Sequence, residues 1–342
     1  MSSAGPMTER VVRAVLLALW RSGGETNMQA VLRETLAPVP EVKQALAILR
    51  QRGCLIEEEP TGALRLVSTG LACWRDVLEE LAQRESWRIG RRVMVFFRTG
   101  STNDVAWQCP PPALHPEMDG LVVLADEQAA GRGRLGHEWV AKAEQSVLMS
   151  VLLRGGQERS AEWLTMVAGL AVAAAVEEAA GALGEKIAAR IKWPNDVLIE
   201  GRKVAGILVE RRGEAVVVGI GVNVMQAAAD FPGALAQRAT SLYQATGRAV
   251  DRLRVVVALV RKLHTYVAAE APERQGWAEE WKGRCGMIGT RITARGAAGA
   301  VAGEVVDVDP LEGLVVRDAA GAVHFLSAQT TTLSGEDSEE GR

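Results

Sequence analysis

The stretch that most constrains the fold runs from residue 189 to residue 224 and reads ARIKWPNDVLIEGRKVAGILVERRGEAVVVGIGVNV. It contains three β-rich runs, separated by the short turns Glu200-Gly201-Arg202 and Arg212-Gly213-Glu214. Turns this short join antiparallel strands, because a parallel pair needs a crossover of about a dozen residues or more. The centre of the chain is therefore predicted to be an antiparallel meander.

Segments on both sides of this meander extend the same domain. Apolar runs predict strands over 120–128 and 146–154, and helical patterns predict helices over 160–182, 251–268 and 272–282. The segment 92–104 predicts a strand that runs into Ser/Thr/Asn-rich chain, where Ser101 or Thr102 can cap a following helix. Helices packed on one side of an antiparallel or mixed sheet define an α+β fold. We assign residues 92–284 to this central domain.

The N-terminal region predicts a winged helix-turn-helix in residues 1–72, followed by a linker helix within 73–91. Three short helical patterns precede two short strands around a Pro/Gly turn. Such a head can bind DNA through its third helix, where the candidate contacts are Lys43, Gln44, Arg50 and Arg52. Glu57, Glu58 and Glu59 open the wing, and their charge repels phosphate. DNA binding and a purely structural role both stay open.

The residue pattern of the sequence changes again after residue 284. Residues 285–334 read as short strands with Gly- and Asp-rich turns, which predicts a small β-barrel. The last residues, 335–342, have the sequence GEDSEEGR and are expected to form a disordered acidic tail.

Bulk properties narrow the class of protein. A net charge of −3 gives no general attraction to nucleic acid or to anionic membranes. The cysteines at 54, 73, 109 and 285 form no C-x-x-C pair, so we expect neither a zinc site nor a disulfide framework and place the protein in the cytoplasm. The most apolar segment, 163–176, ends at Glu177 and Glu178, so no membrane span is expected.

A glycine-rich segment, AAGRGRLGHEW at 129–139, contains the pattern G-x-G-x-x-G. A dinucleotide site needs a tight strand-to-helix turn, but Ala125–Ala130 separate the preceding strand from Gly131, which disfavours a dehydrogenase. Arg132 and Arg134 alternate with glycines, and arginine suits phosphate or carboxylate. The segment therefore predicts an anion-binding loop, with a solvated surface loop as the alternative.

Two further motifs lie in the central meander. In KWPND, Lys192 ends a strand and the Trp-Pro pair forces a turn, so its ammonium is held where it can offset developing negative charge. Asp196 and Lys203 are weaker candidates for the same pocket, and Lys203 can also be a solvated hairpin residue. In GIGVNV at 219–224, Gly219 and Gly221 permit close backbone approach, and Asn223 offers an amide edge.

Taken together, GSTND at 100–104, DEQAAGRGRLGHEW at 126–139, KWPNDVLIEGRKVAGILVE at 192–210 and VVGIGVNV at 217–224 resemble the biotin protein ligase family, and the bifunctional bacterial members in particular. The resemblance implies a winged-helix head, a class II synthetase-like catalytic domain and an SH3-like barrel. It implies that ATP activates biotin to biotinyl-5′-AMP with release of pyrophosphate. A lysine of a biotin carboxyl carrier domain then takes the biotin.

The resemblance also implies partners and cofactors. Mg²⁺ would accompany ATP, with no metal site in the protein itself. A role as a biotin-responsive repressor that binds operator DNA, and a homodimer, stay open, and no membrane partner is implied. Two alternatives remain: a biotin-sensing repressor with weak or lost ligase activity, and a lipoate or octanoate ligase.

Residue roles follow from the resemblance alone. Ser101, Thr102 and Asn103 would line the biotin site, with Thr102 and Gln128 near the ureido ring. The loop formed by Gly131, Arg132, Gly133 and Arg134 would close over the adenylate, and Arg134 would retain it. Lys192 would lie against the biotin carboxylate and the reacting phosphate, with Asp196, Lys203, Gly219 and Gly221 in the same pocket and Asn223 at the adenine. Trp139 would pack under the closed loop.

The chain departs from the family pattern in three places. Ala129 replaces a second glutamine before the Gly-Arg repeat, and Glu144-Gln145 replaces small, glycine-rich chain before the strand at 146–154. The third helix of the head lacks the usual Ser-Arg start, which puts operator binding in doubt and leaves ligation untouched. Because no apolar anchor precedes Leu135 in the loop, we expect residues 129–139 to be mobile without ligand.

Overall fold

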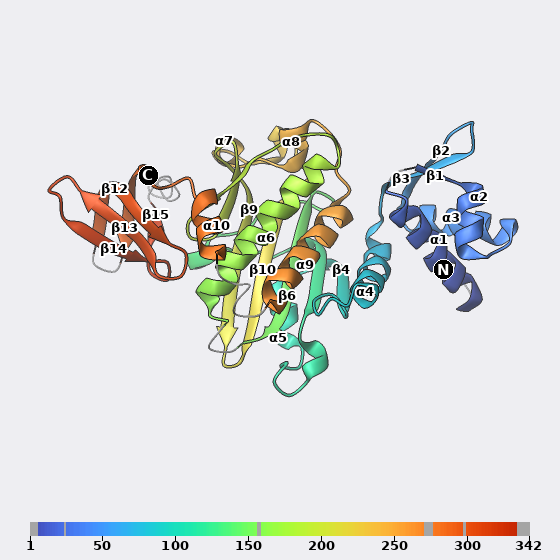
Figure 1. Ribbon diagram of the computed structural model, residues 1–342, viewed down its shortest axis with the longest axis horizontal. Coiled ribbons are helices and arrows are strands. Elements are labelled where there is room, and N and C mark those ends of the chain that lie inside the picture. Colours follow the sequence, from blue (N-terminus) through green and yellow to red (C-terminus); the bar gives the residue numbers. More distant parts are fainter. Residues whose placement is uncertain (1–5, 24, 156–158, 270–275, 297–298, 334–342) are drawn as a thin grey trace.

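The computed structural model describes residues 6–23, 25–155, 159–269, 276–296 and 299–333. Helices with a small sheet, a central domain on a seven-stranded sheet, and a C-terminal antiparallel sheet follow one another along the long axis of the molecule (Figure 1). The predicted α+β class is confirmed. The predicted tail at 335–342 lies outside the described residues.

The N-terminal unit packs three helices on a small antiparallel sheet. The helices are α1 (Pro6–Arg21), α2 (Met28–Thr35) and α3 (Val39–Gln51), and the strand order is β1 (Glu25–Asn27), β3 (Ala63–Ser68), β2 (Leu55–Glu58). Asn27 caps the second helix by accepting a hydrogen bond from the Ala30 amide at 2.9 Å. Helix α4 (Trp74–Arg84) leads to the central domain.

The central sheet has the strand order β4-β5-β6-β10-β9-β8-β7. Its strands are β4 (Val93–Thr99), β5 (Leu121–Gln128), β6 (Ser146–Arg154), β7 (Ala189–Lys192), β8 (Asp196–Ile199), β9 (Arg202–Arg212) and β10 (Ala215–Asn223). Only the β4–β5 pair is parallel, so the predicted meander is confirmed. The count of three runs is wrong: the first run forms two strands, because the turn at Trp193-Pro194-Asn195 reverses the chain.

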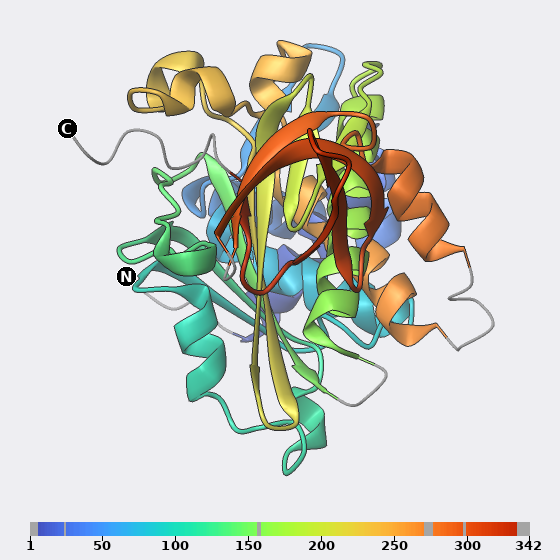
Figure 2. The ribbon, with the colours of Figure 1, turned by 90° about the vertical axis from the view of Figure 1, so that its left-hand side faces the viewer.

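The two faces of this sheet are covered differently. The helices α6 (Ala161–Gly181) and α9 (Arg252–Ala268) pack on one face, as predicted, with α10 (Trp277–Arg284) beside α6. The shorter helix α5 (Thr102–Gln108) lies on the opposite face (Figure 2). Successive side chains of β5 point to opposite faces of the sheet. Val122 and Leu124 belong to the core under α6 and α9, whereas Leu121 and Val123 belong to a small cluster under α5. Part of the α5 face is therefore left uncovered by helices.

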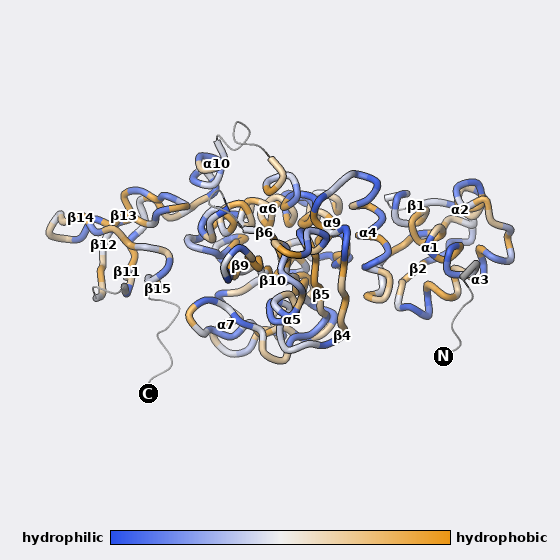
Figure 3. Tube along the Cα trace, turned by 90° about the horizontal axis from the view of Figure 1, so that it is seen from below, coloured by the Kyte–Doolittle hydropathy of each residue, from blue (hydrophilic) through white to orange (hydrophobic). Residues whose placement is uncertain are grey.

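Helix α6 is the apolar centre of the domain. Among the described residues, α6 is the one helix that is long and apolar enough to cross a membrane. However, 72% of its most apolar 18-residue stretch is buried inside the protein. Figure 3 shows hydrophobic chain, in orange, where α6 and α9 lie beside the central strands. Helix α6 is thus a core helix, in agreement with the sequence-based expectation.

Substituting Ser160 with alanine should destabilise this core helix. The Ser160 hydroxyl oxygen accepts a hydrogen bond from the Trp163 amide at 3.1 Å and so caps α6. Losing such a cap costs about 1 kcal/mol, and urea denaturation of the central domain should show a lower midpoint. Ser160→Asp keeps a capping oxygen and is the control. An unchanged midpoint for Ser160→Ala would show that the cap contributes nothing.

The C-terminal unit is a five-stranded antiparallel sheet, β14-β13-β12-β11-β15. Its strands are β11 (Arg291–Gly296), β12 (Gly299–Asp309), β13 (Gly313–Asp318), β14 (Val323–Ser327) and β15 (Thr332–Leu333). Short elements that were not predicted join the larger ones: α7 (Leu235–Arg238), α8 (Leu242–Thr246) and the 3₁₀ turns η1 (Leu71–Cys73), η2 (Pro116–Met118), η3 (Arg134–Gly136) and η4 (Ala228–Asp230).

Candidate ligand site

A cavity of about 530 Å³ opens on the face of the central sheet that carries α5. All but two of the predicted site residues line it, although they come from β5, α5, the loop after β5, and strands β7 to β10. These residues are Ser101, Thr102, Asn103, Gln128, Arg132, Gly133, Arg134, Lys192, Asp196, Lys203, Gly219 and Gly221. The structure therefore brings the separate sequence motifs together at one place.

Three glycines, Gly206, Gly219 and Gly221, form what we call the glycine floor of the cavity. A Cβ atom at Gly219 would lie 2.4 Å from Asn103 Oδ1, and one at Gly221 would lie 2.4 Å from Trp139 Cε2. A Cβ atom at Gly206 would lie 3.0 Å from Trp139 Cζ3. Only glycine leaves room here, so the absence of side chains on β9 and β10 creates the space that Asn103 and Trp139 share with the cavity.

Buried polar side chains form one wall. The Ser150 hydroxyl lies 2.7 Å from Thr102 Oγ1 and 2.6 Å from Asn103 Oδ1. The Thr102 amide and hydroxyl both donate to Gln128 Oε1, at 2.7 and 3.0 Å. Ser101 occupies the N-cap position of α5, but its side chain makes no capping hydrogen bond. These bonds fix polar groups in orientations suited to a ligand with its own donors and acceptors.

The segment 129–139, which we call the arginine loop, folds into a small hairpin over the cavity. The Gly133 amide donates to the His137 carbonyl at 2.7 Å, and the Trp139 amide donates to the Gly131 carbonyl at 3.0 Å. A Cβ atom at Gly131 would lie 2.6 Å from the Trp139 carbonyl oxygen, so this position needs glycine. Gly131 itself does not line the cavity, but it allows the hairpin to close.

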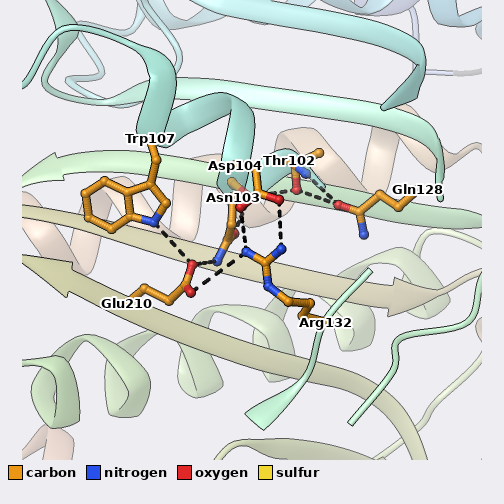
Figure 4. A network of polar contacts seen from close by, with 8 residues as sticks. Thr102, Asn103, Asp104, Trp107, Gln128, Arg132 and Glu210 are labelled. Carbon is orange, nitrogen blue, oxygen red and sulfur yellow. Dashed lines mark hydrogen bonds and ion pairs between the residues drawn. The ribbon is translucent and has the colours of Figure 1, made fainter. Parts of the chain in front are cut away.

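Both arginines of the loop have defined contacts. Arg132 binds the Asp104 carboxylate through two hydrogen bonds, at 2.7 and 2.6 Å (Figure 4). This guanidinium lowers the pKa of the Asp104 carboxyl group, because it favours the charged form. Arg134 donates to the carbonyl oxygen of Ala328 in the C-terminal unit. The loop thus contacts α5 on one side and the C-terminal sheet on the other.

The side chain of Trp139, the last residue of the arginine loop, lies on the glycine floor. The Lys203 ammonium lies 5.6 Å from the centre of its ring. The buried indole Nε1 has no hydrogen-bond partner among the described residues. A buried donor of this kind is costly to leave unpaired, so it is available to a ligand oxygen in the cavity.

Two lysines also line the cavity. Lys192 ends β7 and Lys203 lies near the start of β9, where its ammonium is 2.7 Å from Asp196 Oδ1. Lys192 also lines an adjoining hollow of about 740 Å³ between β7 and the C-terminal sheet. Together with Arg134, these side chains give the site the charge needed to hold an anion.

Asn223, like Gly131, is a predicted site residue that does not line the cavity. It is buried at the end of β10, where its amide nitrogen lies 3.4 Å from the Lys203 carbonyl and its Oδ1 accepts from Gln226 at 3.2 Å. Sequence reasoning missed other lining groups: Gly206, the α7 segment with Arg238, and Thr331–Leu333 from the C-terminal unit. A glycine inside a strand pattern was a usable signal for Gly206 alone.

The cavity of this α+β domain thus combines a polar wall, an arginine loop and two lysines, a lining suited to an organic anion. The family model described as "Biotin/lipoate A/B protein ligase family" matches residues 95–225. The biotin--[acetyl-CoA-carboxylase] ligase of Paracoccus denitrificans is 39% identical over 240 residues, which cover 66% of this chain and 93% of that protein. The chain belongs to the biotin protein ligase family.

Two further relatives are similar to more than half of the chain. The bifunctional ligase/repressor BirA of Bacillus subtilis (strain 168) is 36% identical over 221 residues, 61% of this chain. The match spans 65% of the length of that protein. The structure of the biotin protein ligase from Aquifex aeolicus, in complex with biotin and ATP, is similar with a TM-score of 0.61 and 26% identity, covering 71% of this chain and 98% of that chain.

Proposed function

We propose that the protein is an ATP-dependent biotin–protein ligase. The observation that carries this proposal is the convergence of the polar wall, the arginine loop and Lys192 on one cavity, in a chain of this family. The Aquifex aeolicus relative was solved with biotin and ATP, the two substrates that the first step requires.

The first step joins two anions. The biotin carboxylate attacks the α-phosphorus of ATP, the bond to the leaving pyrophosphate breaks, and biotinyl-5′-AMP forms. Lys192 and Arg134 offset the charge that builds up on the phosphate, and Lys203 adds to the field from the neighbouring strand. Mg²⁺ would enter with ATP as the counter-ion of its phosphates. Asp196 is not proposed as a ligand of this ion, because its carboxylate is already paired with Lys203.

The second step needs no nucleophile from this chain. The lysine ε-amine of a biotin carboxyl carrier domain attacks the carbonyl carbon of the mixed anhydride, and AMP leaves. The protein contributes by holding the two reactants in position and by keeping water from the anhydride. The arginine loop and Trp139 cover the cavity where this protection is required.

The polar wall favours biotin over lipoate or octanoate. The buried Thr102 and Asn103 and the half-buried Gln128 line the cavity with hydroxyl and amide groups. A ureido ring can exchange hydrogen bonds with such groups, whereas a plain acyl chain has no donor or acceptor to offer them. We also propose that Asn223 contacts the adenine. To do so, it must exchange its present contacts with Lys203 and Gln226 for the ligand.

For the whole chain we propose a winged helix-turn-helix over 1–72, a linker at 73–91, a class II synthetase-like catalytic domain over 92–284 and an SH3-like barrel over 285–334. Operator binding has less support than ligation. Arg50 lies 3.6 Å from Glu58 and Arg52 lies 2.5 Å from Glu9, so two candidate DNA contacts are already paired with carboxylates. A cytoplasmic protein, with a homodimer left open, fits this proposal.

The direct test is pyrophosphate release with ATP and Mg²⁺ in the presence of biotin, lipoate or octanoate. A carrier domain is then added, and its mass is measured by mass spectrometry. Release with biotin alone, together with a carrier that gains one biotinyl group, supports the ligase. Biotin binding without release would favour a biotin-sensing repressor, and salt-dependent binding to a palindromic operator would then be measured.

A further inference from the structure

The contacts of Arg132 point away from the cavity that its loop covers. Its guanidinium binds Asp104 through two hydrogen bonds and lies 3.9 Å from the Glu210 carboxylate (Figure 4). Glu210 in turn accepts hydrogen bonds from Asn103, at 2.7 Å, and from the Trp107 indole, at 3.2 Å. Neither Asp104 nor Glu210 is among the described residues that line the cavity. The charged end of Arg132 is therefore held by α5 and β9.

The charges around this contact balance one another. Asp104 and Glu210 are two carboxylates, and the second cation beside them is Arg212, whose guanidinium lies 4.4 Å from the centre of the Trp107 ring. Asp104 is about half exposed, as is Arg132, with side-chain exposures of 43% and 38%. An anionic ligand that drew Arg132 into the cavity would leave the two carboxylates with Arg212 as their remaining nearby cation.

The position of this ion pair matters for the loop. The base of the arginine loop is fixed by backbone bonds from the Ala129 and Ala130 amides to Thr99 and Gly100, both at 2.8 Å. Beyond the base, the backbones of Arg132 and Glu138 form an antiparallel β-bridge across the hairpin. Binding Arg132 to α5 therefore holds the far part of the hairpin down, with Arg134 and Trp139 carried on it.

We propose that Asp104 is a positioning residue that closes the arginine loop by binding Arg132, and that this contact retains biotinyl-5′-AMP until the carrier lysine arrives. The proposal rests on the proposed ligase function. In it, Asp104 does not touch the substrate, and Arg132 acts as the tether of the loop, which leaves Arg134 as the loop arginine that meets the adenylate.

The test separates formation of the adenylate from its retention. The full-length protein and its Asp104→Asn variant are loaded with biotin and ATP, and release of labelled adenylate is followed after rapid dilution. We expect release to be about 5- to 10-fold faster in Asp104→Asn, since a charge-assisted pair at a half-exposed site is lost. Single-turnover pyrophosphate release should change by about two-fold or less. Asp104→Glu, which keeps the carboxylate, should restore part of the retention.

A matched control lies on the other face of the sheet. Glu178 pairs with Arg261 at 2.5 Å, with side-chain exposures of 43% and 40%, close to those of the Asp104–Arg132 pair. Glu178→Gln should leave adenylate release unchanged. Equal release from wild type and Asp104→Asn would overturn the proposal, and so would equal acceleration in both variants, which would indicate a general loss of stability.

A second readout is independent of ligase activity. In the ligand-free protein, trypsin cleavage after Arg132 or Arg134 should be faster in Asp104→Asn than in wild type or Glu178→Gln. If wild type released no pyrophosphate, the proposed function would fail while this readout still tested the tether. Unchanged cleavage in the loop would count against the role of Asp104 whatever the reaction.

Discussion

Replacing Lys192 with alanine is expected to lower the rate of pyrophosphate release by about 10²- to 10³-fold, the usual effect of removing one preorganised group that meets developing charge. The structure fixes Lys192 firmly. It ends β7, and the turn that follows is tied to β9 by the Asn195 side chain, which donates to the Ile207 carbonyl at 2.7 Å, and by the Ile207 amide, which donates to the Asn195 carbonyl at 3.0 Å. An ammonium held in this way needs little rearrangement during the reaction.

The measurement is a single-turnover assay with saturating biotin and ATP, with circular dichroism to establish that the variant is folded. Lys186→Ala is the matched control, because Lys186 is an exposed lysine just before β7 that does not line the cavity. Activity within about three-fold of wild type in Lys192→Ala would remove Lys192 from the reaction.

The sequence predicts the central domain well because local features decide it. The turns at Glu200-Gly201-Arg202 and Arg212-Gly213-Glu214 are too short for a crossover, and strands β9 and β10 pair as that requires. The Trp-Pro pair in KWPND also predicts a turn, but the apolar run continues past it. The reversal that separates β7 from β8 therefore becomes evident only from the pairing of Ile191 with Val197.

Other parts of the site depend on contacts between distant segments. Thr331–Leu333 reach the cavity because the C-terminal sheet packs against the loop, where Arg134 meets Ala328. Asp104 and Glu210 meet Arg132 only because α5 lies on the face of the sheet where the Glu210 side chain of β9 bonds to Asn103 and Trp107. No local pattern of residue types specifies such meetings, so a reading of motifs identifies the arginines and misses the groups that hold them.

The mobility of the arginine loop without ligand stays a prediction. The contact between Arg132 and Asp104 bears on the reason for it. Glycine richness and the late position of Leu135 leave the loop without an early apolar anchor. Arg132 supplies a polar anchor in its place, through Asp104. Because both side chains are about half exposed, this anchor should weaken as salt rises.

Gly221→Ala is expected to weaken biotin binding by about 5- to 150-fold, the range that corresponds to the roughly 1–3 kcal/mol cost of overpacking a well-filled site. The new Cβ atom would lie 2.4 Å from Trp139 Cε2 and 2.6 Å from Cζ2. Trp139 must then move off the glycine floor and take the arginine loop with it. The backbone of a strand accepts alanine without strain, so the loss would come from this collision and not from the backbone.

Isothermal titration with biotin measures this effect, and two variants isolate its cause. Gly181→Ala is the control, since the Cβ atom it adds at the end of α6 meets no atom within 4 Å, and binding should be unchanged. In a Trp139→Ala background the collision is gone, so Gly221→Ala should then cost little, and the two substitutions should be strongly non-additive. Additive losses would mean that Gly221 and Trp139 act separately, and that the glycine floor contacts the ligand directly instead of making room for the indole.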